Sequence, residues 1–110
     1  MLTKLSIGFN NMACLHLLRC GSFTHRHLTE CTAILADDDA IILLDDGCYS
    51  LADPQLQQLC EQQKLCDCYV IVEHATARAL TVPSKHPYKS ISINTLAELL
   101  FQFDNSITWQ

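Results

Sequence analysis

The sequence DAIILLDDGCY, residues Asp39 to Tyr49, contains an apolar run that ends in two carboxylates and a glycine. The run, Ala40–Leu44, has no alternation of polar and apolar side chains. It therefore predicts a strand covered on both faces, as in a parallel sheet flanked by helices. Asp45, Asp46 and Gly47 then predict a tight turn, in which Gly47 is free to take a positive φ. In open α/β sheets, sites and contacts are built at the ends of such strands.

Segments on either side extend this pattern into an alternating α/β chain. Apolar runs predict strands at 14–18, 40–44, 67–72 and 90–93. Helical spacing predicts helices at 22–37, from 54 onward and at 96–103, and residues 73–80 are expected to form a short helix or turn. This order indicates an α/β fold with three layers, in which a mostly parallel sheet of about five strands carries helices on both faces.

Capping residues and prolines indicate where several of these elements begin. Asp53 is suited to be the N-cap of the second long helix, with Pro54 at its first position. Asn94 or Thr95 is expected to cap the last helix. The two prolines in 81–89 predict an exposed loop before the last strand.

Length and composition indicate a single folded domain. The chain has 110 residues, of which 49% are hydrophobic and 17% are charged, which argues against disorder. The low charge also indicates that another subunit covers part of the apolar surface. The net charge of −5 argues against a broad nucleic-acid-binding face, so any role with RNA is expected to be indirect.

Targeting signals and cysteine count indicate the cellular compartment, and the positions of the predicted elements indicate the domain limits. No signal peptide or membrane-spanning run is evident, and seven cysteines, an odd number, on an α/β pattern fit a reducing cytoplasm. Residues 1–13 fit no element and are predicted to be a variable extension, with Met12 as an alternative start. Residues 14–110 are expected to form the domain.

Cys31 is the thiol with the most chemical interest. It lies in the middle of the predicted first helix, and His27 lies one turn earlier, close enough for an imidazole to favour the thiolate. A cysteine on an apolar helix face is also commonly a small core residue. The spacing alone leaves both interpretations open.

Other cysteines offer alternatives. Cys66 and Cys68 share one face of a predicted strand and, with Cys60, are one hypothesis for a small metal site. Because no second pair lies at ligand spacing, core thiols are favoured and no metal is expected. Cys48 is either a half-buried packing residue or a thiol whose pKa is lowered by a nearby helix N-terminus.

Charged and aromatic residues near the strand ends have two interpretations. Asp45, Asp46 and Glu73 suit either cation binding and acid–base chemistry or turns and contacts, and the latter is favoured. Trp109 is expected to pack on the core or across an interface. No phosphate-binding or nucleophile-elbow motif is present, so no cofactor is expected.

The order and spacing of these segments resemble the TusB/DsrH family of small sulfur-relay subunits. Residues 40–49 are similar to its central strand and "DG-Y" signature, which supplies Asp46, Gly47 and Tyr49. Residues 69–80, YVIVEHATARAL, are similar to the next strand and acidic segment. Within them Glu73 and Arg78 match, and Ala79 stands where glycine is common. Residues 15–17 and 91–109 are similar to the opening and closing segments, including Trp109.

The resemblance implies a DsrE/F-like fold and a heterohexamer with TusC/DsrF-like and TusD/DsrE-like subunits, in which this chain is an accessory rather than a catalytic subunit. It implies a transient TusE/DsrC-like sulfur acceptor and a role in 2-thiolation of the tRNA wobble uridine, without metal or organic cofactor. The alternative is a DsrH-type subunit in dissimilatory sulfur oxidation. That branch carries a cysteine in its first helix, and Cys31, sixteen residues before Gly47, falls at this position.

Overall fold

The computed structural model describes residues 13–20, 38–62, 67–85 and 87–109, which form a five-stranded sheet in the order β4-β3-β2-β1-β5. Every pair of neighbouring strands is parallel. The strands are β1 (Cys14–Leu18), β2 (Ala40–Leu43), β3 (Cys68–Ile71), β4 (Tyr88–Ile91) and β5 (Asn105–Trp109). The predicted α/β class and the parallel sheet are confirmed.

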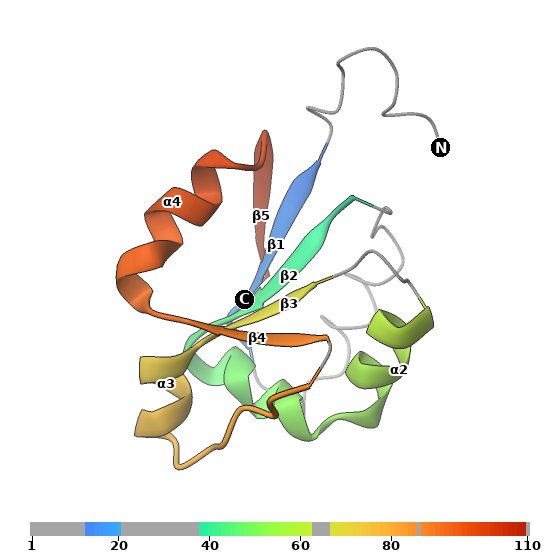
Figure 1. The fold of residues 1–110 in the computed structure, drawn as a ribbon, viewed down its shortest axis with the longest axis vertical. Coiled ribbons are helices and arrows are strands. Elements are labelled where there is room, and N and C mark those ends of the chain that lie inside the picture. Colours follow the sequence, from blue (N-terminus) through green and yellow to red (C-terminus); the bar gives the residue numbers. More distant parts are fainter. Residues whose placement is uncertain (1–12, 21–37, 63–66, 86, 110) are drawn as a thin grey trace.

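Helices cover both faces of this sheet (Figure 1). They are the 3-10 helices η2 (Asp45–Ala52) and η3 (Ile93–Thr95) and the α-helices α2 (Pro54–Gln62), α3 (Val72–Ala77) and α4 (Leu96–Phe101). From β2 to β3 to β4 the chain moves toward one edge of the sheet, whereas from β4 to β5 it crosses back to the opposite edge. Right-handed crossovers therefore place α2 and α3 on one face and α4 on the other. None of the helices within the described ranges is both long and apolar enough to cross a lipid bilayer.

Strand β2 is buried on both faces, as its uninterrupted apolar sequence predicts. Ile41 and Leu43 belong to a core cluster that also contains Leu56 of α2. Ile42 points to the opposite face and packs in a second cluster with Leu99 of α4. All four residues of the strand are buried. The sheet thus separates two apolar cores, which is the arrangement expected of a central parallel strand.

Helix α2 begins as predicted. The side chain of Asp53 accepts a hydrogen bond of 2.9 Å from the backbone N–H of Gln55, and Pro54 occupies the first helical position. Proline costs nothing there because its missing N–H would have no partner within the helix. Leu56 is fully buried on the core side, as expected.

Strand β5 was not predicted. Its sequence, NSITW, is polar and lacks an apolar run, and the strand lies at the edge of the sheet with four of five residues exposed. Trp109 packs on the core of its own chain. Its indole Nε1–H donates to Nδ1 of His16 at 3.3 Å, and the two rings stack at 6.4 Å. Nε2 of the same buried imidazole lies 3.1 Å from Asp39 Oδ2, which joins β5, β1 and the start of β2.

The segment before α4 differs from its prediction in two ways. The exposed loop ends at residue 87, because Pro87 and Tyr88 are buried and Lys89 already belongs to β4. Thr95 stands at the N-cap position of α4, as one of the two expected residues, but its side chain makes no capping hydrogen bond. The side-chain cap belongs to Ser92 at the start of η3, whose hydroxyl accepts a 3.2 Å hydrogen bond from the Asn94 N–H.

Gly47 is needed for close packing, and its freedom to take a positive φ is not used at this position. The left-handed residue after β2 is Asp45, with φ of 52°. A Cβ atom on Gly47 would lie 1.8 Å from the carbonyl oxygen of Leu18. Helix η2 therefore rests directly on the backbone at the end of β1, and only glycine fits at the point of contact.

Replacing Gly47 by alanine should lower the free energy of unfolding by about 3 kcal/mol or more, because neither backbone can move without disturbing β1 or η2. Urea unfolding followed by circular dichroism measures this change. Ala52→Ser, at an exposed position of the same helix, is the control and should change stability by less than about 0.5 kcal/mol. Equal stability of Gly47→Ala and wild type would contradict the contact.

Helix α3 ends in a Schellman motif. The Leu80 N–H bonds to the Ala75 carbonyl at 2.9 Å, and the Ala79 N–H bonds to the Thr76 carbonyl at 3.0 Å. This motif places Ala79 in the left-handed region, with φ of 58°. A residue held in this region favours glycine, which is the residue that the family resemblance leads one to expect here.

Ala79→Gly should therefore stabilise the protein by about 0.5–1 kcal/mol, because the left-handed strain of alanine exceeds the entropy that glycine adds to the unfolded chain. Ala77→Gly, inside the same helix, should have the opposite sign and cost about 1 kcal/mol. Thermal unfolding of the two variants beside wild type distinguishes these outcomes. Destabilisation by both substitutions would argue against the motif.

Candidate functional site

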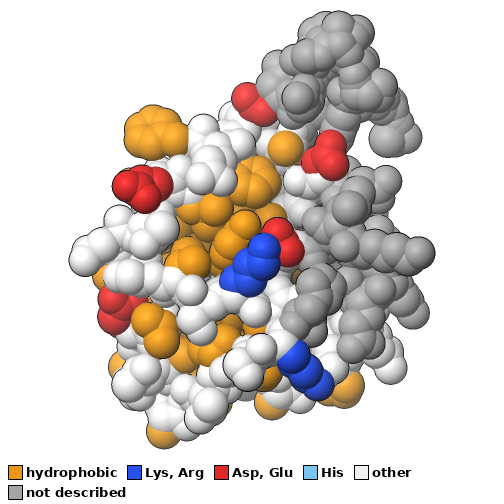
Figure 2. All heavy atoms as spheres, viewed as in Figure 1, with side chains coloured by type: hydrophobic (Ala, Val, Ile, Leu, Met, Phe, Trp, Pro, Cys, Tyr) orange, Lys and Arg blue, Asp and Glu red, His pale blue; other side chains and the backbone are white. Residues whose placement is uncertain are grey.

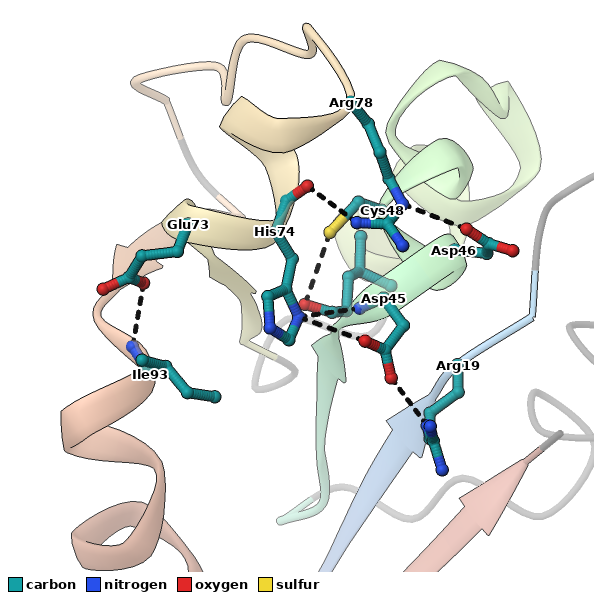
Figure 3. A network of polar contacts seen from close by, with 9 residues as sticks. Arg19, Asp45, Asp46, Cys48, Glu73, His74, Arg78 and Ile93 are labelled. Atoms are coloured by element: carbon teal, nitrogen blue, oxygen red, sulfur yellow. Dashed lines mark hydrogen bonds and ion pairs between the residues drawn. The ribbon is translucent and has the colours of Figure 1, made fainter.

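Polar side chains from three segments meet at the carboxyl edge of the sheet (Figure 3). Arg19 directly follows β1, and Asp45 and Asp46 open η2 directly after β2. His74 lies in α3, which follows β3, and Arg78 caps that helix. Because parallel strands end at a common edge, the topology brings these residues together although they are far apart in sequence.

Asp45 links Arg19 to His74. Its Oδ2 accepts a hydrogen bond of 2.8 Å from Arg19 Nε, and its backbone N–H donates to His74 Nδ1 at 2.8 Å. A backbone N–H can only donate, so Nδ1 is the acceptor and the neutral imidazole carries its proton on Nε2. His74 therefore offers an N–H donor on the side of its ring away from Asp45.

Arg78 forms the second half of this network. Its Nε donates to Asp46 Oδ1 at 3.0 Å, and its Nη1 donates to the His74 carbonyl at 3.1 Å. The hydrogen bond with Asp46 raises the pKa of Arg78 further above its high ordinary value. The Arg19 side chain is 45% exposed and that of Arg78 is 24% exposed, and each guanidinium group is paired with a carboxylate at this edge.

Glu73 has a role of its own beside this network. Its two carboxylate oxygens accept hydrogen bonds from the Ser92 hydroxyl at 2.8 Å and from the Ile93 N–H at 2.9 Å. These hydrogen bonds, the backbone one first, lower the pKa of Glu73 below its ordinary value. Glu73 therefore ties α3 to the start of η3. The three carboxylates of the sequence prediction each bind a different partner.

Cys48 lies beneath the network and is not an activated thiol. It is fully buried, and its Sγ lies 3.8 Å from the Leu43 carbonyl oxygen. Burial raises the pKa of Cys48 to about 11. Of the two predicted interpretations, the lowered pKa is wrong, because burial outweighs the effect of nearby Arg78, and the packing role holds.

We expect native Cys48 to resist iodoacetamide at neutral pH, because its thiolate is almost absent and its sulfur is covered. Peptide mass spectrometry after brief labelling measures modification at this position alone. The same treatment in denaturing urea is the control and should modify Cys48 fully. Labelling of the native protein at the rate of an exposed cysteine would contradict the burial.

The other described cysteines differ in access. Cys14, Cys20, Cys48 and Cys68 are all outside disulfide bonds. Cys68 is fully buried, and burial followed by the charge of Asp39 raises the pKa of Cys14. Cys20 is partly exposed and lies at the carboxyl edge beside Arg19. Among the described cysteines, Cys20 is therefore the partly exposed one at the carboxyl edge.

Several sequence-predicted residues lie outside the described ranges. These include Cys31 and His27 in 21–37, and Cys66 in 63–66. The three-cysteine metal site is therefore untested. Within the ranges that the structure describes, no group of three or more His, Cys, Asp or Glu residues is arranged to hold a metal ion.

Sequence reasoning missed three residues of this edge: Arg19, Cys20 and His74. Arg19 and Cys20 follow β1 just as Asp45 follows β2, so strand-end position was the available signal. His74 carried no comparable signal, because its link to Asp45 spans 29 residues.

Comparison with known proteins decides the family. A family model described as "DsrH like protein" matches residues 21–106, which include η2, α3 and most of the edge network. The chain belongs to the DsrH-like protein family. This confirms the predicted TusB/DsrH resemblance and supports a sulfur-relay subunit that works within a multi-subunit complex. No curated protein matches the sequence significantly.

Solved structures share the fold of this DsrH-like chain. The crystal structure of the ychN protein from E. coli has a TM-score of 0.66 at 13% identity, covering 88% of this chain and 97% of that one. The solution structure of protein Tm0979 from Thermotoga maritima has a TM-score of 0.57 at 18% identity, covering 81% and 92%. At these identities the likeness shows the common α/β architecture.

Proposed function

We propose that the chain is a subunit of a sulfur-relay heterohexamer with TusC/DsrF-like and TusD/DsrE-like partners, required for 2-thiolation of the tRNA wobble uridine. The match to the DsrH-like family over residues 21–106 carries this proposal. A TusE/DsrC-like protein is the transient acceptor of the sulfur. With a net charge of −5, the chain meets tRNA only indirectly.

The carboxyl edge supports this role through its partly exposed hydrogen-bond donors, although each arginine is also paired with a carboxylate. Sulfane sulfur moves between thiolates, and nearby cations favour a thiolate over a thiol. Arg19 and Arg78 are partly exposed at this edge, and His74 adds a neutral N–H donor. The segment that contains His27 and Cys31 begins here, directly after Cys20.

Cys31 is the proposed carrier, with His27 supporting its thiolate. The Cys31 thiolate attacks the outer sulfur of a donor persulfide and forms a new S–S bond. The S–S bond of the donor breaks, and the donor leaves as a thiolate. The burial of Cys48 and Cys68 favours a carrier outside the core.

The signature residues are proposed to lie near a subunit contact. Asp46 and Tyr49 are 60% and 38% exposed, which suits a contact at the carboxyl edge. Gly47 and Trp109 act within the chain itself, the first against Leu18 and the second on His16. Glu73 and Arg78 hold α3 in place beside them.

A DsrH-type subunit in dissimilatory sulfur oxidation is the second candidate. It is favoured by the position of Cys31, sixteen residues before Gly47, together with the inaccessibility of Cys48 and Cys68. In this branch too the subunit carries the persulfide on Cys31 by the same transfer chemistry, but the sulfur enters oxidation instead of tRNA.

Deleting the gene in its host should remove 2-thiouridine from the wobble position, because the relay loses a subunit. Mass spectrometry of tRNA nucleosides measures this, with the restored wild-type gene as control. Unchanged thiolation would contradict the tRNA role. Intact thiolation together with lost oxidation of reduced sulfur compounds would favour the second candidate.

Labelling with radioactive sulfane sulfur separates a carrier from an accessory subunit. The complex containing Cys31→Ser should lose the label on this chain, whereas Cys20→Ser, the matched control at the carboxyl edge, should retain it. Equal labelling of wild type and Cys31→Ser would remove Cys31 from the relay, and loss of label in Cys20→Ser alone would transfer the role to Cys20.

A further inference from the structure

The two faces of the sheet are covered unequally. One face carries η2, α2 and α3, whereas the described residues place only α4 and the short η3 on the other. Helix α4 has six residues, too few to span a five-stranded sheet. Because parallel sheets are normally covered on both faces, the open part of this second face requires another cover.

Side chains on this face form a row across the strands. Strand register aligns Leu17 of β1 with Ile42 of β2, then Tyr69 of β3 and Lys89 of β4. Ile42 is fully buried, but Leu17 and Tyr69 are half-buried, as is Ile91 two residues further along β4. Figure 2 shows apolar side chains uncovered between α4 and the strands. The apolar row thus continues from the core into solvent.

Helix α4 is apolar beyond the side that touches the sheet. Leu96, Leu99 and Leu100 pack in the core cluster of this face. At 100° per residue, Ala97 and Phe101 continue the apolar surface past Leu100, so the apolar arc covers about 200°. Phe101 is 90% exposed. A surface helix needs an apolar stripe of roughly half that width to pack on one sheet, so α4 has a second apolar side.

We propose that this surface, the α4 face, binds a partner subunit whose apolar contact area is bordered by basic residues. The α4 face consists of the following residues: Leu17, Tyr69, Ile91, Leu96, Leu100 and Phe101. The proposal rests on the proposed function, since it assigns one of the contacts that a relay complex requires. It adds a contact on a face other than the carboxyl edge, where the contact of the signature residues is proposed.

The charges around the α4 face favour a different chain over a second copy. Glu98 on α4 and Asp104 after it are exposed, and Figure 2 shows acidic side chains around the apolar patch. The one lysine in the row, Lys89, lies 3.3 Å from Asp67 and over the Tyr69 ring at 5.9 Å. A second copy, also of net charge −5, would bring like charges together, whereas a basic border complements this one.

Hydrogen exchange of the chain, free and in its complex, locates the contact. The complex is prepared by co-expression with the DsrE-type and DsrF-type subunits of the same genome. Peptides over 88–91 and 96–103 should exchange more slowly in the complex, while those over α2 should not change. A complex that protects only α2 and η2 would overturn this inference and leave the proposed function standing. Failure to form any complex would overturn both.

Phe101→Asp tests the exposed aromatic as an anchor. Because the side chain is almost fully exposed, the variant should fold like wild type by circular dichroism while binding the partner subunits about tenfold more weakly or worse. Gln58→Asp, an exposed position on α2, adds the same charge on the other face and should bind within about twofold of wild type. Equal binding by both variants would contradict the α4 face.

The oligomeric state of the isolated chain tests the choice of occupant. Light scattering at low and high salt should show a monomer, and affinity for the partners should fall as salt screens the complementary charges. A stable dimer that Phe101→Asp dissociates would show that a second copy occupies the α4 face, and would overturn the proposed partner.

Discussion

The contact between Gly47 and the Leu18 carbonyl is the constraint on which the rest of the carboxyl edge depends. The same carbonyl accepts a hydrogen bond from the Leu44 N–H at 3.2 Å, so the end of β2 and the start of η2 are both held against β1. With η2 in this position, Asp45 meets Arg19 and His74, and Cys48 is turned into the core. Because glycine has no Cβ atom, the ends of β1 and β2 and the start of η2 can contact one another closely.

Much of the fold was predictable because its signals are local. The apolar run of β2, the cap of α2 and the parallel sheet follow from neighbouring residues alone. Strand β5 was not predictable, since an edge strand with exposed polar residues lacks the apolar pattern that marks a buried one. The reason for Gly47 was also hidden, because a turn glycine and a packing glycine look alike until the opposite backbone is known.

The candidate site was less predictable than the fold for a related reason. Carboxylates after β2 were recognisable as strand-end residues, but their partners come from segments 26 to 32 residues away. The position of Cys48 after the strand was predicted correctly. The pKa of its thiol, however, depends on how far η2 buries it against the sheet. The order of the strands in the sheet decides which side chains meet. The sequence indicates that order only indirectly, because connection lengths and right-handed crossovers limit the possible orders.

The hydrogen bond between Trp109 and His16 has a consequence for how the chain folds. It joins residues 93 positions apart, and β5 occupies the place beside β1 that no earlier strand can fill. Synthesis from the N-terminus therefore leaves one edge of β1 unpaired until residues 105–109 have emerged. Such long-range closure is slow relative to local pairing. Because Trp109 is the one tryptophan of the chain, its fluorescence reports this last event of assembly.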